Sequence, residues 1–260
     1  MKTRVISGLI MVPLLLIIYF GGIPLLIAAA AIGAVGVTEF FNGFEHIGIH
    51  PSRKIAYVMI AILYTGYLLL GPEPVFLMAW LVLSVMAGMI YGWDITSREP
   101  YDAMATVLGL VYIVFFVYHI VLIDVSFYRE LTWLVILAAF GTDIMAYFTG
   151  RAFGKHKLCP NLSPKKTVEG AVGGVIGSAI LCGVFGYFVM PDIFIHCIII
   201  GVVGGIVSEC GDLTASAFKR KMGIKDYGTL IPGHGGIMDR FDSVIFVAPA
   251  VYYYMIFVLP

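Results

Sequence analysis

Long, uninterrupted runs of apolar residues are the feature that most constrains what this chain can fold into. Of its 260 residues, 60% are apolar and 12% are charged, a balance that a soluble globular protein of this length would not tolerate. A helix needs roughly 20 mainly apolar residues to cross the hydrocarbon core, where only helices and closed barrels satisfy every backbone hydrogen bond. The runs are continuous and do not alternate with polar residues, so the sequence predicts an all-α polytopic membrane protein.

The apolar runs predict about nine transmembrane helices. Two pairs of these helices are joined by very short turns, at residues 21–24 and at residues 191–192, and either pair could instead form a re-entrant hairpin. The predicted spans cover residues 5–20, 23–41, 55–70, 74–93, 103–123, 131–150, 171–190, 193–208 and 244–259.

The positions of the basic residues support this count, because Lys and Arg in short loops collect on the cytoplasmic side of a membrane. With nine spans, all of the 16 Lys and Arg residues except Arg129 fall on one side. A different number of spans would place Lys and Arg residues on both sides of the membrane. The sequence therefore predicts a cytoplasmic amino terminus and an outside carboxyl terminus, with longer cytoplasmic segments at residues 42–54, 151–170 and 209–243.

The chain has no linker, low-complexity tract or clear internal repeat, which predicts one membrane-embedded catalytic domain, residues 1–260. The segments 151–170 and 209–243 are its expected active-site segments. The four cysteines have no CxxC spacing and are interpreted as small core residues. The apolar start resembles a signal peptide, but apolar character continues past any cleavage site, so we expect it to be retained.

Small residues in the seventh predicted span predict a close helix contact, either within one subunit or between two subunits of a homodimer. The residues are Gly173, Gly174, Gly177 and Ser178. The compact loops and short chain suggest a bacterial protein of the cytoplasmic membrane.

Carboxylates in or near the spans form the first group of candidate site residues, because ionisable residues in membranes usually mark function. If the eighth helix continues past the membrane, Asp212 shares a face with Ser216 and Lys219. Oxygen ligands suit Mg²⁺, which usually keeps waters and substrate phosphates as its other ligands. The sequence thus predicts a Mg²⁺ site, and leaves a second cation open, with ligands Asp143, Asp212 and Asp239. The alternative is that acids here, Glu209 and Asp242 above all, form ion pairs with nearby bases.

Basic residues and glycines form the second group, and they suit a polyphosphate ligand. Arg offers a planar fork to phosphate oxygens and Lys a point charge, while glycines let the backbone approach an anion closely. His234 can donate to a phosphate oxygen, although it could equally stabilise its own loop. The basic residues are Lys165, Lys166, Lys219, Arg220, Lys225 and Arg240, and the glycines of the loop are Gly233, Gly235 and Gly236.

Two stretches of the sequence form a recognisable pattern. The stronger stretch begins with Ser-Ala-Phe-Lys-Arg at residues 216–220, continues with Lys-Asp at 225–226 and ends with Pro-Gly-His-Gly-Gly-Ile-Met-Asp-Arg-Phe-Asp at 232–242. The second covers residues 153–170. Both resemble the CDP-diacylglycerol synthase, or phosphatidate cytidylyltransferase, family. The likeness is strong from about Thr142 onward, and before that it extends only to hydropathy and length.

This resemblance implies a reaction in which membrane-bound phosphatidate attacks the α-phosphorus of cytosolic CTP at the cytoplasmic surface, giving CDP-diacylglycerol for phospholipid synthesis and pyrophosphate. No strong base is required, because a phosphomonoester has a second pKa near 6. The main task is then to neutralise charge and position two anions.

The resemblance also implies roles for individual residues. Asp212 and Asp239 would bind the metal, with Asp143 as a third ligand or a residue that orients the others. The triphosphate or pyrophosphate would be held by Lys219, Arg220, Lys225, His234 and Arg240, with Gly235 and Gly236 in the same loop. CTP or the lipid phosphate would be held by Ser163, Lys165, Lys166 and Thr167.

Two other classes of protein are consistent with parts of this pattern. A CTP-dependent lipid kinase of the polyprenol or phytol type also joins many spans to a basic cytoplasmic loop. A transporter would spread its polar residues through the membrane depth, whereas here they cluster at one surface. The expected partners are CTP, phosphatidate and the bilayer, and no nucleic acid.

Overall fold

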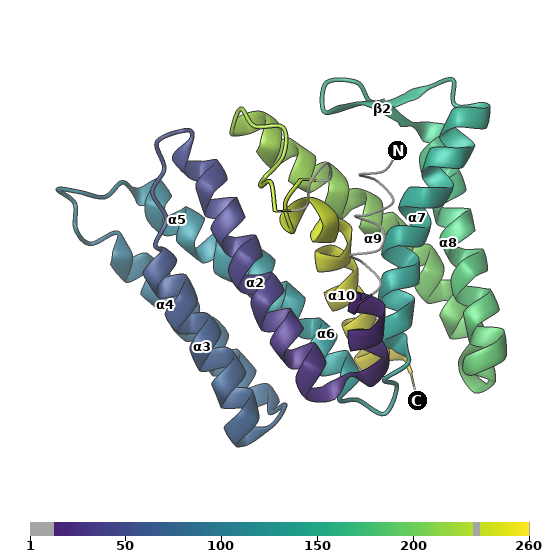
Figure 1. Cartoon of the computed structure of the whole chain (residues 1–260), viewed down its shortest axis with the longest axis horizontal. Helices are drawn as coiled ribbons and strands as arrows, with labels where there is room; N and C mark the ends of the chain where they lie inside the picture. Colours follow the sequence, from purple (N-terminus) through teal and green to yellow (C-terminus); the bar gives the residue numbers. More distant parts are fainter. Residues whose placement is uncertain (1–12, 231–234, 260) are drawn as a thin grey trace. The chain divides into compact units, whose positions relative to one another are not determined.

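The computed structural model describes residues 13–230 and 235–259, and these residues are almost entirely helical (Figure 1). Eight helices among them are long and apolar enough to cross a membrane. The predicted all-α polytopic membrane fold is therefore confirmed. Of the first predicted span, residues 5–20, residues 5–12 lie outside the described residues and residues 13–20 are helical. The predicted orientation of the two termini stays a prediction.

The chain divides into two compact units. The first unit comprises Met1–Val125 and Lys221–Arg240, and the second comprises Ser126–Arg220 and Phe241–Pro260. The chain thus enters the second unit after Val125, returns to the first for twenty residues after Arg220, and ends in the second. The prediction of a single catalytic domain is not tested by this division.

The first unit is a helical bundle with one π-helical turn in its most buried span. Pro100, at the first position of that span, and the reciprocal capping by Glu99 and Asp102 explain where it begins. The π-helical turn was not predicted. The elements are α2 (Gly22–Glu45), α3 (Arg53–Leu70), α4 (Pro74–Tyr91), α5 (Pro100–Gly109), the π-helical η1 (Leu110–Phe115) and α6 (Phe116–Asp124).

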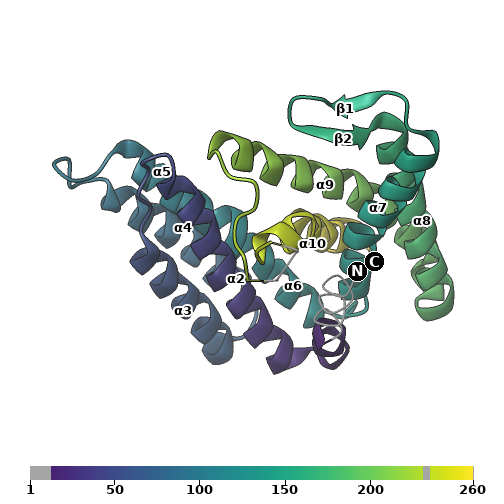
Figure 2. The ribbon, with the colours of Figure 1, turned by 45° about the horizontal axis from the view of Figure 1, so that its top comes forward.

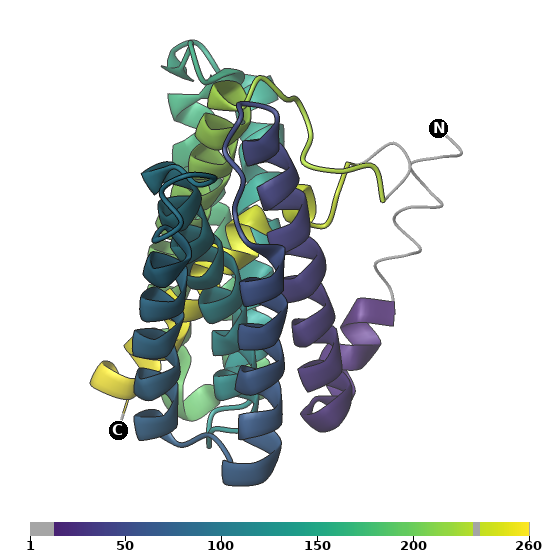
Figure 3. The ribbon, with the colours of Figure 1, turned by 90° about the vertical axis from the view of Figure 1, so that its left-hand side faces the viewer.

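Large side chains of α2 pack directly on that span. Phe40 and Phe41 are fully buried, and the ring of Phe40 meets the ring of Tyr112 edge to face at 5.6 Å. Gly109 leaves the space into which the Phe41 ring fits. At the other end of α2, the backbone N–H of Gly22 donates to Asp124 Oδ2 at 2.6 Å. These contacts fix α2, and with it the loop after α9 that lies beside α2 in Figure 3.

The second unit consists of long helices and a short antiparallel hairpin, which is visible in Figure 2. The sequence predicted the helices but not the hairpin. Because Pro191 begins only a single turn of 3₁₀ helix between two helices that each exceed 20 residues, both are full spans by length, and a re-entrant pair is not needed. The elements are α7 (Leu131–Phe153), β1 (Lys157–Cys159), β2 (Ser163–Thr167), α8 (Val168–Val189), η2 (Pro191–Ile193), α9 (Phe194–Lys221) and α10 (Met238–Val258). The last residue of α9 and the first three residues of α10 are counted with the first unit.

Glycines of α8 allow α7 and α8 to pack closely along their length. A Cβ atom added to Gly174 would lie 2.9 Å from the backbone oxygen of Thr142, and one added to Gly177 would collide with Met145. The close helix contact predicted from these small residues is therefore confirmed within the chain. A homodimer is not tested by this contact and stays a prediction.

Helix α9 continues well beyond the predicted end at residue 208, as far as Lys221. Along this extension Ser216 Oγ and Asp212 Oδ1 lie 3.4 Å apart, one helical turn from each other. The predicted alignment of Ser208, Asp212, Ser216 and Lys219 on one helix is therefore confirmed. The extension places Asp212 in a regular helix and not in a loop.

Candidate active site

A cavity of about 330 Å³ in the second unit gathers several of the predicted site residues. Helix α7 forms one wall, strand β2 and the start of α8 form another, and α9 contributes one carboxylate. The cavity has acidic and basic side chains together with small apolar ones. Its lining residues are Asp143, Ala146, Tyr147, Gly150, Arg151, Lys165, Lys166, Thr167, Gly170, Ala171 and Glu209.

Thr167 connects the hairpin to the cavity wall. Its hydroxyl oxygen accepts from the backbone N–H of Gly170 at 3.1 Å and so caps the amino-terminal end of α8. A Cβ atom on Gly154 would lie 2.8 Å from this hydroxyl, and one on Gly170 would lie 2.9 Å from the backbone oxygen of Ala146. The glycines therefore bring the hairpin against α7, which makes Thr167 a structural cap as well as a lining residue.

Glu169 fixes the start of the hairpin, at the same open end as Thr167. Its carboxylate accepts from the backbone N–H of Lys155 at 3.0 Å and from the Nδ1 of His156 at 2.6 Å. Since Glu169 lies in the first turn of α8, its charge also suits the helix dipole. The sequence analysis did not predict this contact, because nothing in the spacing of His156 and Glu169 indicates it.

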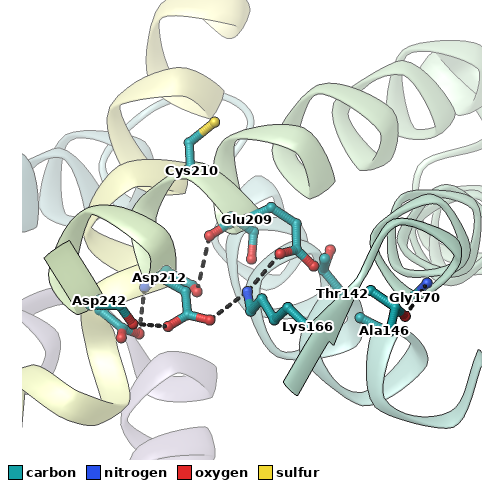
Figure 4. A network of polar contacts seen from close by, with 12 residues as sticks. Thr142, Ala146, Lys166, Gly170, Glu209, Cys210, Asp212 and Asp242 are labelled. Carbon is teal, nitrogen blue, oxygen red and sulfur yellow. Dashed lines mark hydrogen bonds and ion pairs between the residues drawn. The ribbon is translucent and has the colours of Figure 1, made fainter. Parts of the chain in front are cut away.

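Lys166 forms the strongest charged contacts of the site. Its Nζ lies 2.6 Å from Glu209 Oε2 and 2.5 Å from Asp212 Oδ2 (Figure 4). Burial alone would lower the pKa of Lys166, but the two carboxylates outweigh it and hold the pKa above its ordinary range. Lys166 is therefore a permanent cation at neutral pH, held by α9. The alternative interpretation of Glu209 as an ion-pair partner is confirmed.

Asp242 adds a third carboxylate to this part of the second unit. It is 7% exposed, and it lies within electrostatic range of Asp143, Asp212 and Lys219. Its Oδ1 accepts from the backbone N–H of Ser243 at 2.8 Å, and Figure 4 shows Asp212 between Lys166 and Asp242. The predicted acids Asp143 and Asp212 thus have a buried acidic neighbour that the sequence analysis left out of the metal set.

These carboxylates are the chemical type that Mg²⁺ prefers, although their side chains are not gathered at ligand distances. Within residues 13–230 and 235–259, no group of three His, Cys, Asp or Glu side chains is arranged to hold a metal ion. The predicted ligand Asp239 belongs to the first unit. The magnesium site therefore stays a prediction, and its members within the second unit are Asp143 and Asp212.

In the first unit, Asp239 organises the glycine-rich loop that precedes α10. Its Oδ2 accepts from the backbone N–H of Tyr227 at 2.7 Å and from that of Gly236 at 3.0 Å. Gly235 has a φ of 85°, which favours glycine, and a Cβ there would also crowd the Asp239 carboxylate. Asp239 thus shapes the loop, and the predicted roles of this loop in phosphate binding are not tested by these bonds.

The remaining predicted residues fall into three groups. Arg220 and Lys225 are exposed, and Ser163 lies in β2 without lining the cavity. The Nε of Arg240 is buried, with no hydrogen-bond acceptor among the described residues. His234 lies outside the described residues.

The structure adds to the cavity wall two residues of α7 that the sequence analysis did not predict, Tyr147 and Arg151. They follow Asp143 by four and eight residues, and this helical spacing was the signal that could have identified them.

This geometry defines a polytopic membrane protein with a small charged site at the ends of its spans. A family model described as "Cytidylyltransferase family" matches residues 2–258. Relatives named phosphatidate cytidylyltransferase include one from Bacillus subtilis, 30% identical over 97% of both chains, and one from Thermotoga maritima, 30% identical over 97% of this chain and 95% of the relative. Another, from Staphylococcus saprophyticus, is 51% identical over 42% of each chain. The chain belongs to the cytidylyltransferase family, as the resemblance in its sequence implied.

Proposed function

We propose that this protein transfers the cytidylyl group of CTP to phosphatidate. An oxygen of the lipid phosphate forms a bond to the α-phosphorus of CTP, the bond between the α-phosphorus and the bridging oxygen breaks, and pyrophosphate leaves. The products are CDP-diacylglycerol and pyrophosphate. Membership of the cytidylyltransferase family over nearly the whole chain supports this proposal, and so do the names of relatives aligned over 97% of it.

The structural observation that carries the proposal is the charged cavity of the second unit. Arg151 and Lys165 bring cations to a space whose other walls contain Asp143 and small residues. A phosphate-bearing ligand needs cations to offset its charge, while the acids suit the metal ion that usually accompanies a triphosphate. The cavity is too small for a whole lipid, so it would receive a phosphate group while the acyl chains stay in the bilayer.

Mg²⁺ is the cofactor that we propose, with Asp143 and Asp212 as its ligands in the second unit. When bound, it would neutralise phosphate oxygens and stabilise the leaving pyrophosphate. Lys165 and Arg151 would orient the phosphates, and Lys166 would hold the Asp212 carboxylate in place. The attacking phosphate is already largely ionised at neutral pH, so none of these residues has to remove a proton from it.

The proposed site faces the cytoplasm, where CTP is found. The distribution of basic residues supports this orientation. Arg151 and Lys165 lie on the same predicted side of the membrane as every other Lys and Arg residue except Arg129. The buried Nε of Arg240, which has no acceptor among the described residues, offers a further donor for an anion. A cysteine introduced at residue 156 or at residue 127, which flank α7, can be labelled from each side of sealed vesicles to test the orientation.

The reaction itself is tested with labelled CTP and purified protein in phosphatidate-containing micelles. Label on the α-phosphate should enter the lipid, and label on the γ-phosphate should leave as pyrophosphate. A CTP-dependent lipid kinase would give the reverse pattern with a lipid alcohol. Transfer of γ-label to lipid, or no transfer of α-label by well-folded protein, would overturn the proposal.

A further inference from the structure

Glu39 is a buried carboxylate near the carboxyl-terminal end of the membrane helix α2, and it binds the start of α10. It is 6% exposed. Its Oε1 accepts from the backbone N–H of Ile237 at 3.1 Å, and its Oε2 accepts from that of Met238 at 2.8 Å. Both partners lie in the first unit with Glu39. One carboxylate therefore holds two successive N–H groups almost 200 residues away in sequence.

These two N–H groups belong to the start of α10, which begins at Met238. The first N–H groups of a helix have no partner within it, and the side chain of the preceding residue usually caps them. Ile237 precedes α10 and has no acceptor in its side chain, while Asp239 bonds to Gly236 and Tyr227 instead. Glu39 supplies the missing cap from another helix, and its negative charge suits the positive end of the helix dipole.

Two glycines of the loop leave the space that Glu39 occupies. A Cβ atom on Gly228 would overlap Glu39 Oε1, and one on Gly236 would overlap both of its carboxylate oxygens. The sequence analysis explained Gly236 by close approach to a phosphate. The structure adds a second reason, because either glycine would have to displace Glu39 if it carried a side chain.

The contacts around Glu39 enclose the loop between α9 and α10 from both ends. Tyr227, at its start, packs its ring 6.0 Å from that of Phe40, the residue after Glu39. Ile237 and Met238, at its end, bond to Glu39 itself. The loop contains Lys225, Gly235 and Gly236 of the predicted triphosphate site, and the predicted metal ligand Asp239 follows in the first turn of α10. Whatever fixes Glu39 therefore also fixes backbone that would contact the phosphates.

We infer that Glu39 is a positioning residue for the nucleotide site, because it fixes the loop backbone at Gly228 and from Gly236 to Met238. This inference rests on the proposed function, since it takes the loop to bind the CTP phosphates. Glu39 does not reach the substrate. Its effect is transmitted through the backbone of Gly228 and of Gly236 to Met238, and it should appear in the KM for CTP more than in the KM for phosphatidate.

Glu39→Ala and Glu39→Gln test the inference, with Glu45→Gln as the matched control. Glu45 lies on the same helix, and its carboxylate pairs with Arg53 at 2.6 Å. Glu39→Ala removes both bonds and should lower kcat/KM for CTP about 10- to 100-fold, as expected for lost hydrogen bonds to a charged group. Glu39→Gln keeps one acceptor, so its kcat/KM for CTP should lie between the values of Glu39→Ala and wild type. The kcat/KM of Glu45→Gln should match wild type.

Two further measurements distinguish positioning from simple loss of stability. Hydrogen exchange of residues 226–230 and 235–238 should speed up in Glu39→Ala, while the exchange of α3 and α4 and the thermal midpoint stay close to wild type. Gly228→Ala should impair the wild-type enzyme, but it should add little to Glu39→Ala, because the colliding carboxylate is gone.

Several outcomes would overturn the inference. They are unchanged CTP kinetics in both Glu39 variants, a loss of activity that merely follows the loss of folded protein in both, or full additivity of Gly228→Ala and Glu39→Ala. Failure of wild-type protein to transfer α-label from CTP is a different result. It would reject the proposed function, whereas an active wild type with unaffected Glu39 variants rejects only the positioning role.

Discussion

The ammonium group of Lys166 lies 2.5 Å from the carboxylate of Asp212. The sequence analysis gave these residues different ligands, the lysine a phosphate and the aspartate a metal ion. In the structure they share one ion pair, which Glu209 extends. Because a change to one residue alters the charge around the other, the two must be studied as a unit.

Lys166→Met should destabilise the protein more than Lys165→Met does. The side chains of Lys166 and Glu209 are 20% and 10% exposed, so removing the cation leaves two carboxylates close together with little access to water. We expect a loss of about 1–3 kcal/mol, less than for a fully buried pair because water partly screens the charges. Thermal unfolding in detergent measures the difference. Equal midpoints for the two variants would contradict the expectation.

The stabilisation from Lys166 should not depend on pH across the neutral range. Its folded-state pKa is raised above the ordinary 10.5 because the attraction of two carboxylates outweighs the effect of burial. A raised pKa means that the contribution is complete below about pH 10 and is lost only as pH rises through the folded-state value. The difference in midpoint between wild type and Lys166→Met should therefore be constant from pH 6 to pH 9. A difference that disappears by pH 9 would show that the pair is not charged as described.

Asp143→Asn and Asp212→Asn test the proposed magnesium site. Each removes one negative oxygen donor, so the Mg²⁺ concentration for half-maximal activity should rise about tenfold or more, and EDTA should abolish wild-type activity. Asp192→Asn is the control, because Asp192 is exposed in the short turn between α8 and α9. Wild-type Mg²⁺ dependence in folded Asp212→Asn protein would remove that residue from the proposed site.

Gly174→Ala should disturb the packing of α7 and α8. The new methyl group would meet the backbone oxygen of Thr142 at 2.9 Å, and backbone cannot move aside as a flexible side chain can. Overpacking of this kind costs about 1–3 kcal/mol. Ile180→Ala on the same helix is the control, since Ile180 is exposed. The comparison uses the midpoints of thermal unfolding or of unfolding by detergent. A midpoint for Gly174→Ala at or above that of wild type would show that the two helices can separate freely.

The spans could be predicted from sequence because the bilayer imposes the same requirement on each of them. Length and apolar character decide whether a helix can cross, and these are local properties. The continuation of α9 could also be predicted, since Asp212 and Ser216 have helical spacing and no residue between them breaks a helix. The π-helical turn at residues 110–115 could not be predicted, because an apolar sequence has the same pattern whether its backbone is α-helical or π-helical.

The site could be predicted only in part, because its contacts join residues that are far apart in sequence. The motif indicated which segments bear chemistry, and Lys165, Lys166 and Asp143 do line one cavity. It could not show that Lys166 pairs with Asp212, nor that Glu39 caps α10. In a single sequence, Glu39 is one acid in an apolar helix, and its partners are backbone N–H groups, which every residue except proline has.

Arg240→Lys should weaken phosphate binding although it keeps the positive charge. The Nε of Arg240 is buried without an acceptor among the described residues, so a bound anion that accepts from it would relieve an unpaired donor. Lysine has no equivalent of Nε and cannot present a planar fork, and we expect the KM for CTP and the inhibition constant for pyrophosphate each to rise about tenfold. Arg98→Lys is the matched control, because Arg98 lies over the ring of Tyr91 in another loop of the first unit. If Arg240→Lys leaves pyrophosphate inhibition unchanged, the anion does not bind at Nε, and Arg240 serves the loop and not the nucleotide.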